Sequence, residues 1–94
     1  MLTFALTEQL KRDFAALTPE QRDAFRKAIA RFVQDLGAGR FRRGLRVRGV
    51  QGARGIFEMT WAPDGRATFE FGPSLREDEP HVIWLAIGTN DIPP

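Results

Sequence analysis

The sequence predicts an α+β domain in which an N-terminal pair of helices packs on one face of a mostly antiparallel four-stranded sheet, in the order ααββββ. Three observations support this. The chain has only 94 residues, which suits one small domain. Residues 7–36 repeat apolar residues at helical spacing, and the segments after Gly39 are typical of β-strands. Helices followed by a run of strands are typical of this layered class. We expect a single domain over residues 1–94, built around one core.

The two helices are predicted from apolar spacing and capping signals. Residues 7–17 place apolar side chains at i, i+4 and i+7, at Leu10, Phe14 and Leu17. The stretch "TPEQ" (18–21) then supplies an N-cap threonine, a proline at the first helical position and a glutamine that completes a capping box. The inner face of this second helix comprises Phe25, Ile29, Phe32, Val33 and Leu36. Gly37 stands where the helix is expected to end.

Four strands are expected after Gly39. Residues 45–50, "LRVRGV", alternate apolar and basic residues, as a strand with one buried and one wet face does. Residues 55–61 and 66–71 flank the turn signal "APDG" and are predicted to form a β-hairpin. Residues 81–87, "HVIWLAI", are apolar on both faces, so they are expected to form the most buried, central strand.

Composition narrows the classes of function. The chain has no cysteine and one histidine, His81, so we expect no metal site and no cofactor. Its longest apolar run, residues 82–87, is far shorter than the ~20 residues that a membrane span needs, and we expect no membrane partner. The N-terminus lacks a basic start followed by a long apolar stretch. A cytoplasmic location is therefore the expectation.

Positive charge is concentrated in one segment. Residues 40–54 hold six arginines and no acid. Alternation predicts that Arg46 and Arg48 share one strand face, with Arg54 in the following loop and Arg66 at the start of the third strand. Such a group suits nucleic-acid phosphates, an acidic segment of a protein partner, or simple solvation of the surface. The sequence does not separate these interpretations.

Other residues have a structural and a functional interpretation. His81 has no identifiable partner in the sequence and is expected to be structural. Trp61 and Trp84 lie in strand segments, where aromatic rings form core more often than a base-stacking platform. Glu58 and Glu70 are placed to face one another across the hairpin, where they would share acid/base work or balance nearby arginines.

The order of elements, the arginine-rich strand, the hairpin and a last apolar strand ending in "IGTNDI" resemble the RelE/ParE-type toxins of bacterial type II toxin–antitoxin systems. The resemblance covers residues 18–92. It implies a helical hairpin on a curved antiparallel sheet, with a cognate antitoxin wrapped around the toxin. Many members are ribosome-dependent endoribonucleases that cut mRNA, and others poison DNA gyrase. The implied partners are therefore the antitoxin, the ribosome and mRNA.

The resemblance also implies roles for particular residues. Arg66 matches the arginine that opens the third strand in ribonuclease members, where it stabilises charge on the phosphate. Asp64 matches an acid in the same turn of some members, and Arg48 matches a basic position that holds the RNA backbone. Asn90 stands where a histidine or tyrosine assists proton transfer, and an amide does not titrate near neutral pH. Residues 85–86, Leu-Ala, fall where basic side chains often precede the glycine.

Two functional hypotheses follow. The first is an mRNA endoribonuclease that inhibits translation, with catalytic candidates Arg66, Asp64 and Asn90. Its nucleic-acid-binding candidates are Arg46, Arg48 and Arg54. The alternative is a non-catalytic binding module on the same fold, either a degenerate toxin or a gyrase inhibitor, that acts through protein partners.

Overall fold

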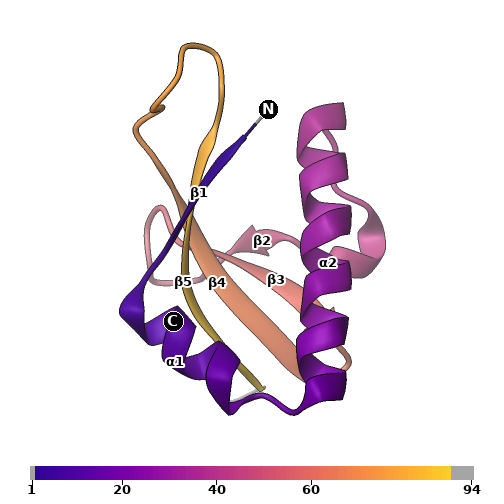
Figure 1. The fold of residues 1–94 in the computed structure, drawn as a ribbon. Coiled ribbons are helices and arrows are strands. Elements are labelled where there is room, and N and C mark those ends of the chain that lie inside the picture. Colours follow the sequence, from indigo (N-terminus) through magenta and orange to yellow (C-terminus); the bar gives the residue numbers. More distant parts are fainter. Residues whose placement is uncertain (1, 90–94) are drawn as a thin grey trace.

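The computed structural model describes residues 2–89 and confirms the α+β class (Figure 1). The elements are β1 (Thr3–Leu6), α1 (Glu8–Ala16), α2 (Pro19–Ala38), the 3-10 turn η1 (Arg43–Leu45), β2 (Arg48–Gly49), β3 (Phe57–Ala62), β4 (Gly65–Gly72) and β5 (His81–Thr89). Within residues 2–89, five strands form one sheet in the order β1-β5-β4-β3-β2. Strand β5 was predicted to be central, but it is the second strand, between β1 and β4, and β4 is the central one. No helix in this part of the chain is long and apolar enough to span a membrane.

Strand β1 was not predicted from the sequence. It lies at the sheet edge and runs parallel to β5, with Thr3 opposite His81 and Leu6 opposite Trp84. Four residues give too few alternations for a periodic signal, and their pairing partner lies at the other end of the chain. Thr3 Oγ1 lies 2.7 Å from His81 Nδ1 at a distance of 78 positions in sequence. This hydrogen bond and the burial of His81 confirm its structural role.

Both helices begin where the sequence predicts, but α2 ends later. The Thr18 hydroxyl accepts the Gln21 backbone N–H, and the Gln21 side chain accepts the Thr18 N–H, which completes the expected capping box. The predicted end at Gly37 is wrong. Helix α2 runs through this glycine and is capped by Gly39, whose φ of 80° lies in the left-handed region. Gly37 follows Leu36 and Gly39 follows Ala38, and either glycine suits a C-cap, so local sequence does not distinguish them.

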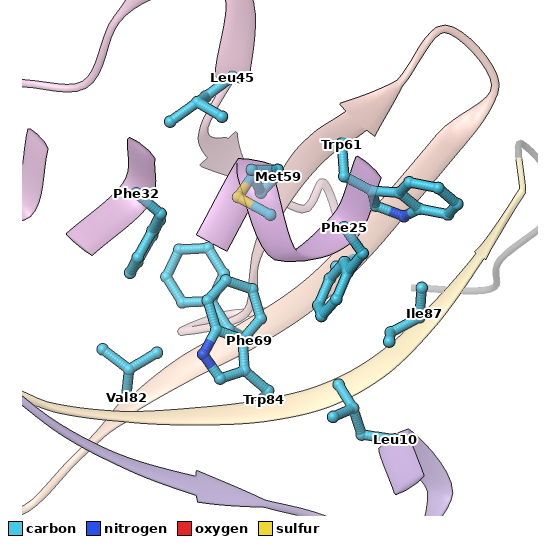
Figure 2. Packing of buried hydrophobic residues seen from close by; sticks show 12 residues of the cluster. Leu10, Phe25, Phe32, Leu45, Met59, Trp61, Phe69, Val82, Trp84 and Ile87 are labelled. Carbon is cyan, nitrogen blue, oxygen red and sulfur yellow. The ribbon is translucent and has the colours of Figure 1, made fainter. Parts of the chain in front are cut away.

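The core is an aromatic layer between α2 and the strands β3, β4 and β5 (Figure 2). The ring centroids of Phe32, Phe69 and Trp84 lie 5.0 to 5.1 Å from one another. Phe25 presents its ring nearly edge-on to Trp61 at 6.0 Å. Such pairs stabilise the core beyond their area burial. Both tryptophans are buried, so their prediction as core residues is confirmed.

The arginine-rich segment differs most from its predicted structure. Strand β2 contains only Arg48 and Gly49, and the preceding Arg46 has a left-handed φ of 45°. Arg46 is therefore outside the strand, and the prediction that alternation places it on one face with Arg48 is wrong. Leu45, the last residue of the 3-10 turn η1, is buried in the core, and the chain bends directly after it at Arg46. On the neighbouring strand, Glu58 lies opposite Thr68 rather than Glu70.

Candidate nucleic-acid interface

A basic pocket of about 730 Å³ lies where α2 and the loop after it meet the end of β3 and the start of β4. Its arginines are Arg31 from α2, Arg42 and Arg46 from the loop, and Arg66 from β4. The lining contributed by residues 2–89 includes no acidic side chain. A concave site lined by cationic side chains concentrates anions. The planar guanidinium group matches the geometry of phosphate oxygens.

Arg66 is fixed by both neighbours in the sheet. It lies opposite Thr60 on β3 and opposite Gly88 on β5. Its half-buried guanidinium donates through Nη1 to the Gly65 carbonyl at 3.1 Å. Its own carbonyl accepts the indole N–H of Trp61 at 2.9 Å. These contacts give the Arg66 backbone a defined position at the pocket.

The turn before Arg66 is tightly packed. A Cβ on Gly65 would lie 2.5 Å from Cε2 of Trp61, so the Trp61 ring lies directly against this backbone. Gly65 also pairs with Thr89, which brings the end of β5 next to the start of β4. Gly88 and Thr89 at the end of β5 are therefore neighbours of Arg66 and Gly65 in the sheet. Asp64 is exposed in this turn and is not among the residues that line the pocket.

Asp35 holds Arg42 in place. The Asp35 carboxylate accepts hydrogen bonds from Arg42 Nε at 2.8 Å, from Nη2 at 2.9 Å and from the Arg42 backbone N–H at 2.8 Å. These bonds, the side-chain ones first, lower the pKa of Asp35 from 3.8 to about 2. The same pairing raises the pKa of Arg42. Arg42 therefore fixes the loop, and its charge is already compensated.

The remaining pocket arginines are not compensated in this way. Within residues 2–89, Arg31, Arg46 and Arg66 have no carboxylate within ion-pair distance. The pocket is therefore positively charged, because Arg31, Arg46 and Arg66 line it and only Arg42 is paired with a carboxylate. Such a site favours a polyanion with successive negative groups.

The structure brings together only part of the predicted site. Arg46 and Arg66 both line the pocket, whereas Arg48 and Arg54 do not. Arg48 forms an ion pair with Glu58, with 2.6 Å between Nε and Oε1. Arg54 is exposed in the loop before β3. Asn90 lies outside the described residues.

Sequence reasoning missed Arg31 and did not single out Arg42. Arg31 lies three residues after Ala28, which is buried and also lines the pocket. A polar residue at i+3 from a core position flanks the buried face of a helix, and this spacing was the available signal. No group of three or more histidine, cysteine or acidic side chains within residues 2–89 is arranged to hold a metal ion.

The fold defined by these elements is that of the RelE-type toxins of toxin–antitoxin systems. No protein-family model matches the sequence, and no curated protein matches it significantly. The chain resembles the Escherichia coli DinJ–YafQ toxin–antitoxin complex with a TM-score of 0.68 and 12% identity, over 94% of this chain and 91% of that one. A metal-bound toxin from Helicobacter pylori gives 0.63 and 14%, over 95% and 94%. The RelB–RelE antitoxin–toxin complex from Methanococcus jannaschii gives 0.61 and 9%, over 90% and 88%.

Proposed function

We propose that this chain is the toxin of a toxin–antitoxin pair and acts as a ribosome-dependent endoribonuclease that cuts mRNA and inhibits translation. The likeness of fold supports the class of protein. The observation that carries the activity is the pocket that Arg31, Arg46 and Arg66 line without a compensating carboxylate among the described residues. Both the ribosome and mRNA are anionic partners that such a surface attracts.

Arg66 has the central role in the proposed reaction. Attack of a ribose 2′-hydroxyl on the adjacent phosphate requires activation of the hydroxyl, stabilisation of charge on the phosphorane and a proton for the leaving oxygen. A half-buried guanidinium held by its neighbours in the sheet is suited to the second requirement. Arg31 and Arg46 would hold the flanking phosphates in the same pocket.

Proton transfer is proposed to depend less on the protein. Within residues 2–89, the lining of the pocket includes no histidine and no carboxylate. Asp64, in the turn before Arg66, and Asn90, after the end of β5, are the candidates for contact with the reacting oxygens. Asp64 is exposed and does not line the pocket, and the Asn90 amide cannot act as a general acid or base. Charge stabilisation and alignment of the RNA would therefore supply most of the rate enhancement.

The test is induced expression of the wild type, Arg66→Ala and Arg76→Ala, with growth recorded and mRNA 5′ ends mapped. Arg76 is an exposed arginine in the loop between β4 and β5, away from the pocket, and serves as the matched control. We expect growth arrest and new mRNA ends for the wild type and the control. Cleavage by Arg66→Ala should fall by about 10²–10³-fold, which is typical of losing one charge-stabilising group. Unchanged arrest and cleavage in Arg66→Ala would remove this residue from the mechanism.

A non-catalytic function is the second candidate. It is favoured by Asn90, which stands where the resemblance implies a histidine or tyrosine. Leu85 and Ala86 also favour it, because they stand where the resemblance implies basic side chains before the glycine. A gyrase inhibitor on this fold would arrest growth with mRNA intact and with altered DNA supercoiling. A degenerate toxin would bind its partner without arresting growth. The same cultures distinguish these outcomes from ribonuclease activity.

We also propose that a cognate antitoxin, encoded next to this chain, binds and neutralises it in the cytoplasm. The relatives DinJ–YafQ and RelB–RelE are complexes of this kind. Co-expression of the neighbouring reading frame should restore growth. Arrest that persists despite a stable complex of the two proteins would contradict neutralisation.

A further inference from the structure

Trp61 contacts the backbone on both sides of Arg66. Its indole N–H donates to the Arg66 carbonyl at 2.9 Å. Its ring lies against Gly65, since a Cβ built on this glycine would lie between 2.5 and 2.8 Å from three ring atoms of Trp61. The Gly65 carbonyl in turn accepts a hydrogen bond from Nη1 of Arg66 at 3.1 Å. One side chain therefore holds the backbone before and after the candidate catalytic arginine.

A β-bulge places Trp61 at this position. Thr60 on β3 pairs with Arg66 on β4, whereas Ala62 pairs with the residue before Arg66. Two steps along β3 therefore match one step along β4, which leaves Trp61 as the extra residue. A bulged residue leaves the regular ladder, so its side chain takes a direction that regular pairing does not provide, and bulges are frequent next to active sites. This bulge lies directly beside the start of β4.

Trp61 is itself held by α2. It is buried, and the ring of Phe25 meets it at 90°, with 6.0 Å between the ring centroids (Figure 2). Phe25 also packs edge-on against Trp84 at 6.2 Å, which ties this contact to the core. Side chains locked by packing hold their neighbours in one geometry, and such supporting contacts give a site its precision. The start of β4 is thus connected through Trp61 to α2.

The second tryptophan shows that the hydrogen bond of Trp61 is not a general consequence of burial. Trp84 is even more deeply buried, and its Nε1 has no hydrogen-bond partner within residues 2–89. Two indoles therefore lie in the same core, and the one beside Arg66 is the one that donates. They form a natural pair of test and control positions.

We propose that Trp61 is a positioning residue that holds the Arg66 guanidinium where charge develops on the phosphorane. This inference rests on the proposed function, because it assigns a further residue to the proposed reaction. Trp61 also lines the basic pocket, but it is too buried to offer the face of its ring to a base. Its effect is therefore on the rate and not on the affinity for RNA, since misplacing a catalytic group by about 1 Å costs up to about 10²-fold in rate.

The experiment measures single-turnover cleavage of a defined mRNA on ribosomes programmed with it, over a range of concentrations of the purified chain. Trp61→Phe removes the indole N–H and retains an apolar ring. Trp84→Phe makes the same change at the indole without a partner and is the control. We expect Trp61→Phe to cut at least about tenfold more slowly at saturation, with a half-saturating concentration within about twofold of the wild type. Trp84→Phe should cut like the wild type, and circular dichroism establishes that both variants are folded.

Gly65→Ala tests the same contact from β4 without removing a core side chain. The added Cβ has to displace the Trp61 ring or the turn. Gly49→Ala is the control, because a Cβ on this strand glycine meets nothing within 4 Å. We expect Gly65→Ala to slow cleavage as Trp61→Phe does. The double variant should be less impaired than the product of the two single effects, since both changes disturb one contact. Effects that multiply would contradict this shared contact.

The NMR signal of Arg66 Nε reports the position of the guanidinium without any cleavage, and its loss in Arg66→Ala assigns it. This signal should shift in Trp61→Phe and Gly65→Ala and stay in place in the two controls. A wild-type rate in Trp61→Phe would overturn the inference and leave the proposed function intact. Weaker binding at an unchanged saturated rate would replace positioning with direct contact between Trp61 and RNA. A wild type that cuts no RNA would overturn the proposed function, whereas an unshifted Nε signal in Trp61→Phe would overturn the positioning itself.

Discussion

Asp35 connects the last turn of α2 to the loop that carries the pocket arginines. It is buried, with 8% of the residue exposed, and accepts three hydrogen bonds from Arg42. A carboxylate bound in this bidentate manner has one geometry, unlike a flexible surface pair. The turn η1 begins at the next residue, so this contact sets where Leu45 enters the core and where Arg46 enters the pocket.

The lowered pKa of Asp35 predicts a pH dependence of stability. The pKa is about 2 in the folded protein and 3.8 in the reference state, so the unfolded chain takes up the proton first as pH falls. The stabilisation from Asp35 is therefore complete above about pH 5 and is lost as pH falls from about 4 through about 2. Urea denaturation of wild type and Asp35→Asn should give a difference in unfolding free energy that shrinks over this interval.

Asp23→Asn is the control for this measurement, because Asp23 is exposed and forms only a surface pair with Lys27 at 3.1 Å. It is expected to change the unfolding free energy by less than about 0.5 kcal/mol at neutral pH. A wild-type to Asp35→Asn difference that stays constant down to pH 2 would show that the hydrogen bonds of Asp35 do not stabilise the folded state.

Helix α2 ends at a particular glycine, and the two glycines near its end have opposite requirements. Gly37 is helical and a Cβ added there meets nothing within 4 Å. Gly39 has a φ of 80°, a backbone conformation that residues with a Cβ rarely adopt. The cap matters for the pocket, because the backbone N–H of Arg40 donates to the Asp35 carbonyl at 3.1 Å immediately after it.

Alanine substitution separates these two positions. Gly37→Ala should raise the unfolding free energy by up to about 1 kcal/mol, because alanine loses less backbone entropy on folding than glycine. Gly39→Ala should lower it by about 1–2 kcal/mol, because a left-handed conformation is costly for alanine. Thermal denaturation measures both, and the two variants serve as controls for one another. Equal effects of the two substitutions would contradict the assigned helix end.

The tertiary arrangement joins α1 to the last strand. Strand β1 pairs with β5 only as far as Trp84, and beyond that point side chains near α1 satisfy the open edge. Thr7 Oγ1 donates to the Leu85 carbonyl at 2.7 Å, and Asp13 Oδ2 accepts the Ile87 N–H at 2.9 Å. These contacts span 78 and 74 positions in sequence. They hold the end of β5 at the point where Gly88 lies opposite the candidate catalytic arginine.

Removal of Asp13 should therefore loosen the end of β5. Asp13→Ala leaves the Ile87 N–H without its acceptor and is expected to lower the unfolding free energy by about 1–2 kcal/mol. Amide hydrogen exchange at Ile87 should become faster. Asp13→Asn retains a side-chain carbonyl and should restore part of the protection. Gln9→Ala is the control, because it removes the hydrogen bond to the other carboxylate oxygen of Asp13 and one from Arg12 but leaves the bond to Ile87. Exchange at Ile87 that is as slow in Asp13→Ala as in the wild type would exclude this role.

The sequence by itself determined the features that depend on neighbouring residues. The helix starts follow from Thr7 and from the capping box at Thr18, since the signal and the hydrogen bond involve the same four residues. The hairpin of β3 and β4 follows from "APDG" between two apolar segments. The place of Arg66 at the start of β4 was also predicted, because it directly follows that turn.

The tertiary structure decided the features that depend on contacts between distant residues. Strand β1 forms by pairing with β5, which lies at the other end of the chain. Its four residues are too few for a periodic sequence pattern. Arg46 joins Arg31 and Arg66 in one pocket only because the chain bends at η1, which alternation does not reveal. Phe4 and Leu6 are exposed, although their residue types are typical of a protein core. Their exposure follows from where α2 crosses the sheet, since burial is fixed by the packing of layers and not by the residues themselves.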